Sequence, residues 1–372
     1  MFVLGAGPAG TMAALTLARV GVACRLLERN TAATDKVCGE FLSPEAVARL
    51  TELDFPWALA QAGTIRQVRV EAVGRAVTMP LPFEARSVSR SFLDDWMLNF
   101  AERAGVQVQR GVYVRDVTPM SDHYELRTTG GSFAAQTLVL ATGKHAMARL
   151  HPRQPARGPS VVGWKMNFHN MGSQLQQALH ETLGLLFFAG GYGGVSRVAK
   201  DALTVSLLVQ PHLLAGHAAD GVSFLQALAP RLPLLSLVLA ESMPVWDRAK
   251  TVANLPYGHC DKANQAQRGL FVVGDQFAVL PSFTGTGISF AMASGALAAR
   301  HVATSSPSSS YAQEARVMAR KVLRRALPLH RLLQRPTFAH VAMAALGFVP
   351  NLLPFIAKGT RVHEPKFVKG LV

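Results

Sequence analysis

Residues 2–29 read FVLGAGPAGTMAALTLARVGVACRLLER, and this stretch decides the fold of the chain. The apolar opening predicts a buried strand, and Gly5-Ala6-Gly7-Pro8-Ala9-Gly10 predicts a tight turn. An Ala/Leu-rich helix follows, which we expect to end at Gly21, and a second strand ends at Glu28. A strand, glycine turn, helix and strand in this order are typical of a dinucleotide-binding fold, in which the phosphates lie at a helix N-terminus.

The residues of this motif have separate expected roles. Gly5 permits the tight turn, Gly7 lets the backbone approach a diphosphate, and Gly10 allows close packing of the helix. The Glu28 carboxylate is placed to accept hydrogen bonds from an adenosine ribose, and its charge would repel the 2'-phosphate of NADP. Three further positions complete this end of the predicted cofactor site: Ala9, Arg29 and Val114.

A second strand and glycine-rich helix start lie far along the chain. The uncharged residues 270–273 predict a buried parallel strand that ends at Gly274-Asp275. Gly285-Thr286-Gly287-Ile288 then opens a predicted helix that runs to Val302. The positive end of such a helix stabilises negative charge on a group bound against it.

The two motifs together resemble those of FAD-dependent enzymes of the p-hydroxybenzoate hydroxylase and geranylgeranyl reductase superfamily. In that superfamily the aspartate, here Asp275, binds the ribityl chain, and the helix start, here Gly285 to Ile288, faces the pyrimidine edge of the flavin. The resemblance extends from Phe2 to about His301 and implies that the chain binds FAD.

Two shorter segments add to this resemblance. Ser89-Arg90-Ser91-Phe92-Leu93-Asp94 looks like the superfamily's Arg-x-x-x-Asp segment, in which the arginine, here Arg90, contacts the cofactor. A solvated arginine before a helix is the alternative. Residues 36–41 resemble the Lys-x-Cys-Gly-Gly segment beside the flavin of geranylgeranyl reductases, which adds Gly39 to the predicted site. Glu40 replaces the second glycine, and an ordinary buried thiol is the alternative for Cys38.

The rest of the chain predicts an interleaved second domain. Short strands are expected between Arg66 and Pro80, and Ser91 is expected to cap a helix that ends at Gly105. An antiparallel sheet is expected from Val161 to Gln210, with strands at 161–168, 183–189, 195–200 and 202–209 and a turn at Gly190 to Gly194. A short linker is expected from Ser305 to Ser310.

These elements predict an α/β (α+β) fold. Residues 1–65, 85–158 and 262–304 would form a Rossmann-like FAD-binding domain. Residues 66–84 and 159–261 would form the antiparallel-sheet substrate domain, and residues 305–372 a C-terminal helical region.

The composition and net charge limit which binding partners the sequence predicts. The net charge of +15 and the pI near 10.4 favour an anionic partner without choosing one. A basic run from Arg316 to Arg335 precedes an apolar stretch from Phe338 to Ile356, which suggests peripheral contact with a membrane surface more than nucleic acid; a packed helical pair is the alternative. Three widely spaced cysteines and an opening without a signal sequence predict a cytoplasmic protein, possible membrane contact aside. A monomer or homodimer is expected.

The leading functional hypothesis is an FAD-dependent monooxygenase that hydroxylates or epoxidises a hydrophobic aromatic, polyketide or isoprenoid compound. NAD(P)H would bind only transiently as the reductant. The close rival is a reductase that saturates carbon-carbon double bonds in a prenyl chain. The chain reads Ala141-Thr142-Gly143-Lys144 where hydroxylases carry an Asp-Gly pair, which weakens the monooxygenase hypothesis.

Two further hypotheses have less support. A halogenase should carry a Trp-x-Trp-x-Ile signature, which Trp164-Lys165-Met166 does not provide. A flavin-free prenyl-protein-binding relative would not need Glu28, Arg90 and Asp275. Histidine spacing predicts no metal site. In a flavoenzyme the cofactor carries the redox chemistry, so the sequence assigns no catalytic residue; the candidates are Lys36, Cys38 and Trp164.

Overall fold

A parallel sheet carries the first glycine motif. The computed structural model describes residues 1–145, 147, 149–152, 160–217, 220–262, 267–333, 335 and 357–362. The strands of this sheet are, in spatial order, β17 (Leu270–Val272), β10 (Leu138–Leu140), β1 (Phe2–Leu4), β2 (Arg25–Glu28) and β6 (Gln107–Arg110). All four pairings are parallel. Only β10 separates β1 from β17, so the carboxyl ends of the strands that precede both predicted motifs lie at one edge of the sheet.

Helices α1 (Pro8–Arg19) and α3 (Arg90–Arg103) pack against strands of this sheet. Helix α7 (Gly287–Ala303) packs against α1, and α2 (Pro44–Thr51) packs against α7. The helices α1 and α7 approach closely, because a Cβ atom at Gly295 would lie only 2.1 Å from the Ala9 carbonyl oxygen. This contact fixes the start of α1 against the middle of α7. A small sheet of β7 (Val114–Pro119), β8 (Tyr124–Thr128) and β9 (Gly131–Ala135) lies beyond them.

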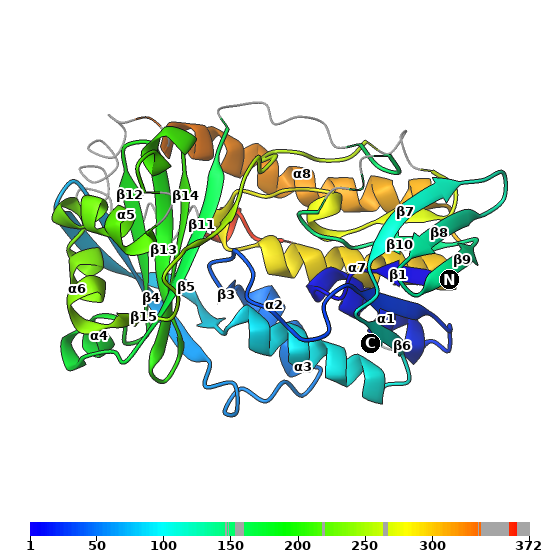
Figure 1. The fold of residues 1–372 in the computed structure, drawn as a ribbon, viewed down its shortest axis with the longest axis horizontal. Helices are drawn as coiled ribbons and strands as arrows, with labels where there is room; N and C mark the ends of the chain where they lie inside the picture. The colour runs from blue at the N-terminus through cyan, green and yellow to red at the C-terminus, as the bar shows by residue number, and fades with distance from the viewer. Residues whose placement is uncertain are drawn as a thin grey trace.

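A second, nine-stranded sheet forms the other half of the molecule (Figure 1). Its strands are β3 (Phe41–Leu42), β4 (Gly63–Ala72), β5 (Arg75–Ser87), β11 (Val162–His169), β12 (Thr182–Phe188), β13 (Gly191–Ala199), β14 (Ala202–Val209), β15 (Met243–Pro244) and β16 (Lys250–Val252). Every pairing is antiparallel except β12 with β4, which is parallel. The predicted domain boundaries at residues 65 and 85 fall within β4 and β5.

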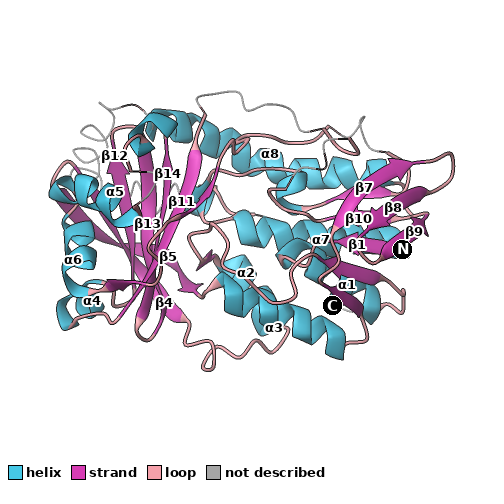
Figure 2. Cartoon of the chain, viewed as in Figure 1, coloured by secondary structure: helices cyan, strands magenta, loops and turns pink. Residues whose placement is uncertain are grey.

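The two faces of the second sheet have different partners. Helices α4 (Ser173–Ala178), α5 (Gly221–Leu228) and α6 (Pro233–Glu241) cover its outer face, as Figure 2 shows, and complete a separate apolar core. The inner face looks toward α7 and the parallel sheet. Short 3-10 helices among the described residues are η1 (Pro211–Leu214), η2 (Ala229–Arg231), η4 (Gly274–Gln276) and η5 (Ser282–Thr284).

The basic segment near the C-terminus is a helix, α8 (Ser308–Leu333), which lies alongside α7 (Figure 1). Its apolar side is buried against the hydrophobic core around the parallel sheet, through Tyr311, Ala315 and Val322. The helix therefore begins within the predicted linker, which is shorter than expected. The apolar stretch from Phe338 to Ile356 lies outside the described residues. Among the helices that the structure describes, none has the length and hydropathy needed to cross a bilayer.

Two local predictions were wrong. The residues Gly191 to Gly194 belong to β13 and are not a turn, because they pair with Leu208 and its neighbours in β14; only Gly190, with φ of 80°, lies in the turn. The N-cap of α3 is Ser89 and not Ser91, since the Ser89 hydroxyl accepts a hydrogen bond from the Phe92 amide at 3.3 Å. The α/β fold with an interleaved, largely antiparallel sheet is confirmed.

Candidate functional site

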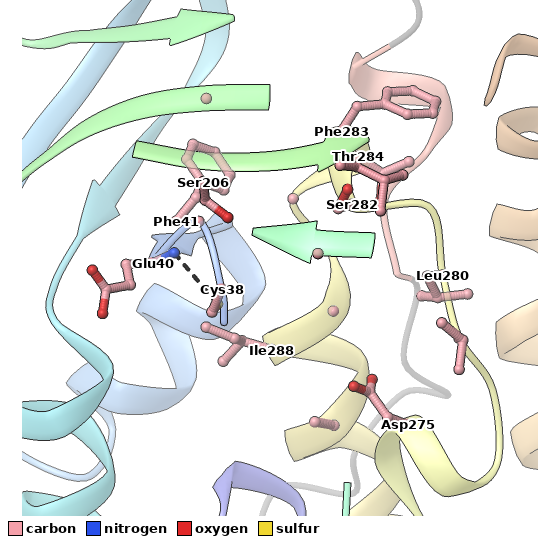
Figure 3. Close-up of a pocket in the computed structure, with 18 of the residues that line it drawn as sticks. Cys38, Glu40, Phe41, Ser206, Asp275, Leu280, Ser282, Phe283, Thr284 and Ile288 are labelled. Atoms are coloured by element: carbon pink, nitrogen blue, oxygen red, sulfur yellow. Dashed lines mark hydrogen bonds between the residues drawn. The ribbon is translucent and has the colours of Figure 1, made fainter. Parts of the chain in front are cut away.

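A cavity of about 520 Å³ lies between the two sheets and reaches both predicted motifs. Ten of the predicted cofactor and catalytic residues line it: Gly7, Ala9, Cys38, Gly39, Arg90, Gly274, Asp275, Gly285, Gly287 and Ile288. Its volume is in the usual range for sites that bind small organic molecules. One half of Figure 3 shows the loop from Leu280 to Thr284, and the other shows the segment from Cys38 to Phe41.

The three glycines of the first motif differ in what they permit. Gly5 has φ of 99°, which disfavours any other residue, and a Cβ atom at Gly10 would lie 1.9 Å from the Gly5 carbonyl oxygen. Gly7 has φ of −74°, which any residue adopts, and a Cβ atom there would point into the cavity, with the Arg90 guanidinium 3.9 Å away. The absence of a side chain at Gly7 therefore keeps the space beside α1 open. Gly5 and Gly10 are required for the fold of the turn itself.

Arg90 is held in place beside this loop. Its Nε and Nη2 atoms donate to the two carboxylate oxygens of Asp94 at 2.9 and 2.8 Å. Burial opposes the charge of Arg90, but the Asp94 carboxylate and the Cys38 side chain together outweigh burial and raise the arginine pKa. The guanidinium thus remains charged next to Gly7, where an anionic diphosphate would bind.

The adenosine end of the predicted site lies outside the cavity wall. Glu28, at the end of β2, accepts hydrogen bonds from the Ala6 amide at 3.0 Å and from the Asn30 amide at 3.0 Å. Arg29 contacts the His145 ring at 2.7 Å, and Val114 is the first residue of β7. Glu28 therefore holds the glycine loop in the geometry that the first motif requires.

The second motif supplies the opposite wall. Gly274 and Asp275 follow β17, and the Gly274 amide donates to the Ser294 hydroxyl of α7 at 2.9 Å. The α7 N-cap, Thr286, makes no side-chain cap, so the first amides of the helix, at Gly287 and Ile288, remain at the cavity. Hydrogen-bond donors with the positive end of a helix dipole therefore border the cavity.

The segment from Cys38 to Phe41 closes one side of the cavity. In Figure 3 Cys38 and Ile288 extend toward the same region, whereas the Glu40 carboxylate points away from both. Glu40 has φ of 57°, a conformation that favours glycine, and this agrees with the glycine found at that place in the reductases. The Lys36 amine bonds to the Thr34 hydroxyl at 3.1 Å, and burial lowers its pKa; Lys36 does not line the cavity.

Glu40 forms a buried ion pair that the sequence did not reveal. Its carboxylate accepts hydrogen bonds from the Lys165 amine at 2.7 Å and from the Arg90 amide, the first of α3, at 2.8 Å. Both charged side chains are fully buried, and burial raises the pKa of Glu40. The pair joins the Cys38 segment to α3 and to β11. Trp164, next to Lys165, packs against Phe224 in the apolar core between the second sheet and helices α4 to α6. It does not line the cavity.

The end of the cavity under the second sheet is apolar. Its side chains come from β4, β12, β14 and α8: Val68, Leu183, Leu185, Phe187, Leu207, Leu208 and Leu329. Tyr192, in β13, is the buried polar exception. Its hydroxyl lies 3.1 Å from the Ser282 hydroxyl and 3.1 Å from the His330 Nδ1 atom. Burial raises the pKa of Tyr192, and it raises that of the neighbouring Tyr257 to about 12.

The cavity suits a dinucleotide that carries a planar ring. Cβ atoms at Gly39 and Gly287 would have no neighbour within 4 Å, so these backbones border open space as Gly7 does. Basic Arg90 and the starts of α1 and α7 match a diphosphate and the electron-rich edge of a flavin. The residues present thus fit FAD, with the diphosphate at Gly7 and the ring at α7.

Fold and site together define the chain as a flavoprotein oxidoreductase by class. The chain belongs to the FAD binding domain family, whose match covers residues 1–186. It is an FAD-dependent oxidoreductase of that family.

Two of the similar proteins are named as reductases. The menaquinone reductase of Mycobacterium tuberculosis is 26% identical over 315 residues, which cover 80% of this chain and 74% of that protein. The geranylgeranyl diphosphate reductase of Rhodobacter capsulatus is 29% identical over 159 residues, which cover 42% of this chain and 39% of that protein.

Solved structures share the fold over nearly the whole chain. The flavin-dependent brominase Bmp2 superposes with a TM-score of 0.79 at 16% identity, covering 97% of this chain and 94% of its own. A geranylgeranyl bacteriochlorophyll reductase-like protein from Thermoplasma acidophilum gives a TM-score of 0.72 at 16% identity, covering 96% of this chain and 97% of its own. At this identity the likeness shows the fold alone.

Proposed function

We propose that this protein reduces a carbon-carbon double bond of a hydrophobic, isoprenoid-type compound with bound FAD. The observation that carries the proposal is the composition of the cavity. Its polar end fits the cofactor, and its other end, under the second sheet, is walled by leucine, valine and phenylalanine side chains. An apolar chain placed there would have its double bond next to the flavin end.

The relatives support reduction over oxygenation. The menaquinone reductase of Mycobacterium tuberculosis and the geranylgeranyl diphosphate reductase of Rhodobacter capsulatus are named for the reduction of prenylated compounds. Where hydroxylases of the superfamily carry an Asp-Gly pair, this chain has Gly143-Lys144, and the Lys144 amine donates to the Val37 carbonyl oxygen at 2.7 Å. That position is therefore used to hold the Cys38 segment. Monooxygenation, the first choice from the sequence, becomes the competing function.

Saturation of a double bond needs a hydride and a proton. Bound FAD would supply the hydride, after its own reduction by a donor that we propose to be NAD(P)H. The Tyr192 hydroxyl would hold the proton, since its pKa is raised by burial and it therefore stays protonated at neutral pH. The neutral His330 ring and Ser282, hydrogen-bonded to the same hydroxyl, would relay a proton to it from solvent after each turnover. Cys38, on the opposite wall, is the alternative donor.

Anaerobic turnover tests this function. Purified holoprotein would be reduced with NAD(P)H or dithionite and mixed, without oxygen, with menaquinone and geranylgeranyl diphosphate as probes. We expect a product whose prenyl chain, rather than its quinone ring, gains two hydrogens, with the simultaneous return of the oxidised flavin spectrum. Oxygen consumption that depends on the substrate, with labelled oxygen in the product, would instead establish the monooxygenase.

The proton donor has its own test. Tyr192→Phe should lower kcat by about 100-fold or more, with KM and FAD content nearly unchanged. Tyr124→Phe is the matched control, because the Tyr124 hydroxyl bonds to the Arg268 carbonyl oxygen at 2.7 Å in the small sheet, away from the cavity. Equal kcat in the Tyr192→Phe variant and the wild type would transfer the role to Cys38, which Cys38→Ala then examines.

A further inference from the structure

Two histidines and one aspartate converge outside the cofactor cavity. His151 follows the loop after β10, and His259 and Asp261 lie on an extended segment before β17. Cys260, between them, forms a β-bridge with Ala278. Residues two apart on extended backbone point to the same side, which is why His259 and Asp261 face one another's ligand atoms.

The distances match those of ligands that share one ion. The His151 Nε2 atom lies 2.8 Å from one oxygen of Asp261, and the His259 Nε2 atom lies 3.2 Å from the other. One ligand atom from each of the three residues can be chosen so that all lie within 4.8 Å of one another. Two atoms that bind one tetrahedral metal at about 2.0–2.1 Å are roughly 3.3 Å apart. The cluster needs only small adjustments to hold an ion.

One ring nitrogen of each histidine lacks a hydrogen-bond partner. The Nε2 atoms of His151 and His259 are buried, and neither makes a hydrogen bond despite the nearby carboxylate. The side chain of His259 is only 4% exposed. By contrast, the His301 Nε2 atom does hydrogen-bond to the Glu314 carboxylate at 3.1 Å. A buried ring nitrogen without a hydrogen-bond partner is costly unless something binds it.

We propose that His151, His259 and Asp261 bind a divalent first-row transition-metal ion. Two imidazoles and one carboxylate are a donor set that Zn²⁺ and its neighbours prefer, whereas Mg²⁺ and Ca²⁺ prefer oxygen ligands. A space of about 20 Å³ beside His151 and Asp261 is large enough for one water as a fourth ligand.

The ion would hold the second cofactor motif in place. The Asp261 amide donates to the Phe277 carbonyl oxygen at 2.9 Å, and the Val279 amide donates to the His259 carbonyl oxygen at 3.1 Å. Phe277 follows shortly after Asp275, and Val279 lines the cofactor cavity. The ion therefore joins the loop after β10 to the segment that shapes the cavity wall, and its role is structural.

Metal content tests the proposal directly. Tag-free holoprotein would be dialysed against a chelator, titrated with Zn²⁺ by calorimetry and analysed for bound zinc by mass spectrometry. We expect one equivalent of Zn²⁺ in the wild type that His259→Asn and Asp261→Asn each lose. His301→Asn, which alters the separate His301–Glu314 pair, should keep it. Equal zinc content in the wild type and Asp261→Asn would overturn the proposal, as would loss of the same equivalent in His301→Asn.

A measurement on the wild type alone covers variants that fail to fold. Because a ligand that binds only the folded state raises its stability, Zn²⁺ should raise the Tm of chelator-treated wild-type protein, and Mg²⁺ at the same concentration should not. A Tm that Zn²⁺ leaves unchanged or lowers would overturn the proposal, because it would show that the three residues bind no metal. Bound FAD, followed by its absorbance, reports independently on the cofactor site.

Discussion

Gly7 and Asp275 line the same cavity, although one lies at the start of α1 and the other just after β17. The adjacency of β1, β10 and β17 and the close crossing of α1 with α7 at Gly295 bring them together. One bound molecule can therefore contact both. The account of cofactor and function depends on this arrangement.

Substitutions at two glycines of the first motif should affect different properties of the protein, FAD binding at Gly7 and stability at Gly10. Gly7→Val should fold with nearly unchanged stability but lose FAD, because its side chain would occupy the space beside Arg90. Gly10→Ala should lose at least about 1–3 kcal/mol of stability, since its Cβ atom would overlap the Gly5 carbonyl oxygen. Flavin absorbance and urea denaturation measure the two effects. Gly130→Val, in an exposed turn with ordinary contacts only, is the control, and full FAD content in Gly7→Val would contradict the assignment.

The buried ion pair of Glu40 and Lys165 predicts that the stability lost on replacing Lys165 depends on whether Glu40 keeps its charge. Lys165→Met should destabilise the protein by about 3–5 kcal/mol, because it leaves the Glu40 carboxylate buried without its partner. Adding Glu40→Gln should recover most of that loss, since glutamine is neutral and can still accept the hydrogen bond from the Arg90 amide. Urea unfolding of the wild type, both single variants and the double variant gives the coupling. A loss below about 1 kcal/mol in Lys165→Met would show that the pair is not an essential contact.

His330 predicts a pH dependence of stability. Burial, with a smaller effect of Arg331, lowers the His330 pKa from 6.5 to about 4. The unfolded chain then binds this proton more readily than the folded one, so its contribution is complete above pH 6.5 and is lost as the pH falls toward 4. The loss amounts to about 3 kcal/mol.

His330→Gln isolates this contribution, because glutamine can hydrogen-bond to Tyr192 but does not titrate. The unfolding free energy of the wild type minus that of the variant should fall by about 3 kcal/mol when the pH is lowered from 7.5 to 4. Low pH therefore destabilises the wild type more than the variant. A difference that stays constant over this range would mean that His330 titrates alike in both states.

The sequence predicted the cofactor end of the site because its signals are local. Gly5, Gly7 and Gly10 have distinct steric roles within one turn, and Gly274-Asp275 follows a recognisable buried strand. The departure at Glu40 was also visible, but its meaning was not: its partner Lys165 is far along the chain, and only the fold shows that both are buried.

The substrate end was harder to predict because its signals depend on pairing between strands. The run Gly190-Gly191-Tyr192-Gly193-Gly194 looked like a turn, since glycine-rich runs usually are. Its residues pair with β14, so Tyr192 is held within a strand against the cavity. His151 lies far from His259 and Asp261 in sequence, so spacing alone gave no metal-site signal.

The exposed face of α8 predicts contact with anionic membranes. Arg320, Lys321, Arg324 and Arg331 are exposed on this helix. Each cation near an anionic surface contributes about 1 kcal/mol, so Arg320→Gln with Arg324→Gln should weaken vesicle binding by about 2 kcal/mol, or roughly 30-fold. Sedimentation with phosphatidylserine-containing vesicles measures this.

The control pair is Arg19→Gln with Arg103→Gln, which removes two exposed cations from α1 and α3 instead. Binding should also weaken as salt rises and be absent with purely phosphatidylcholine vesicles. Equal losses in the two pairs would indicate a general effect of net charge rather than a docking face on α8.

A crystal structure of the protein with FAD tests the central claim most directly. The account predicts the diphosphate against the Gly7 backbone and Arg90, with the ring against Asp275 and the amides at the start of α7. A flavin bound elsewhere, or a diphosphate that contacts Gly7 while the ring lies away from α7, would contradict it.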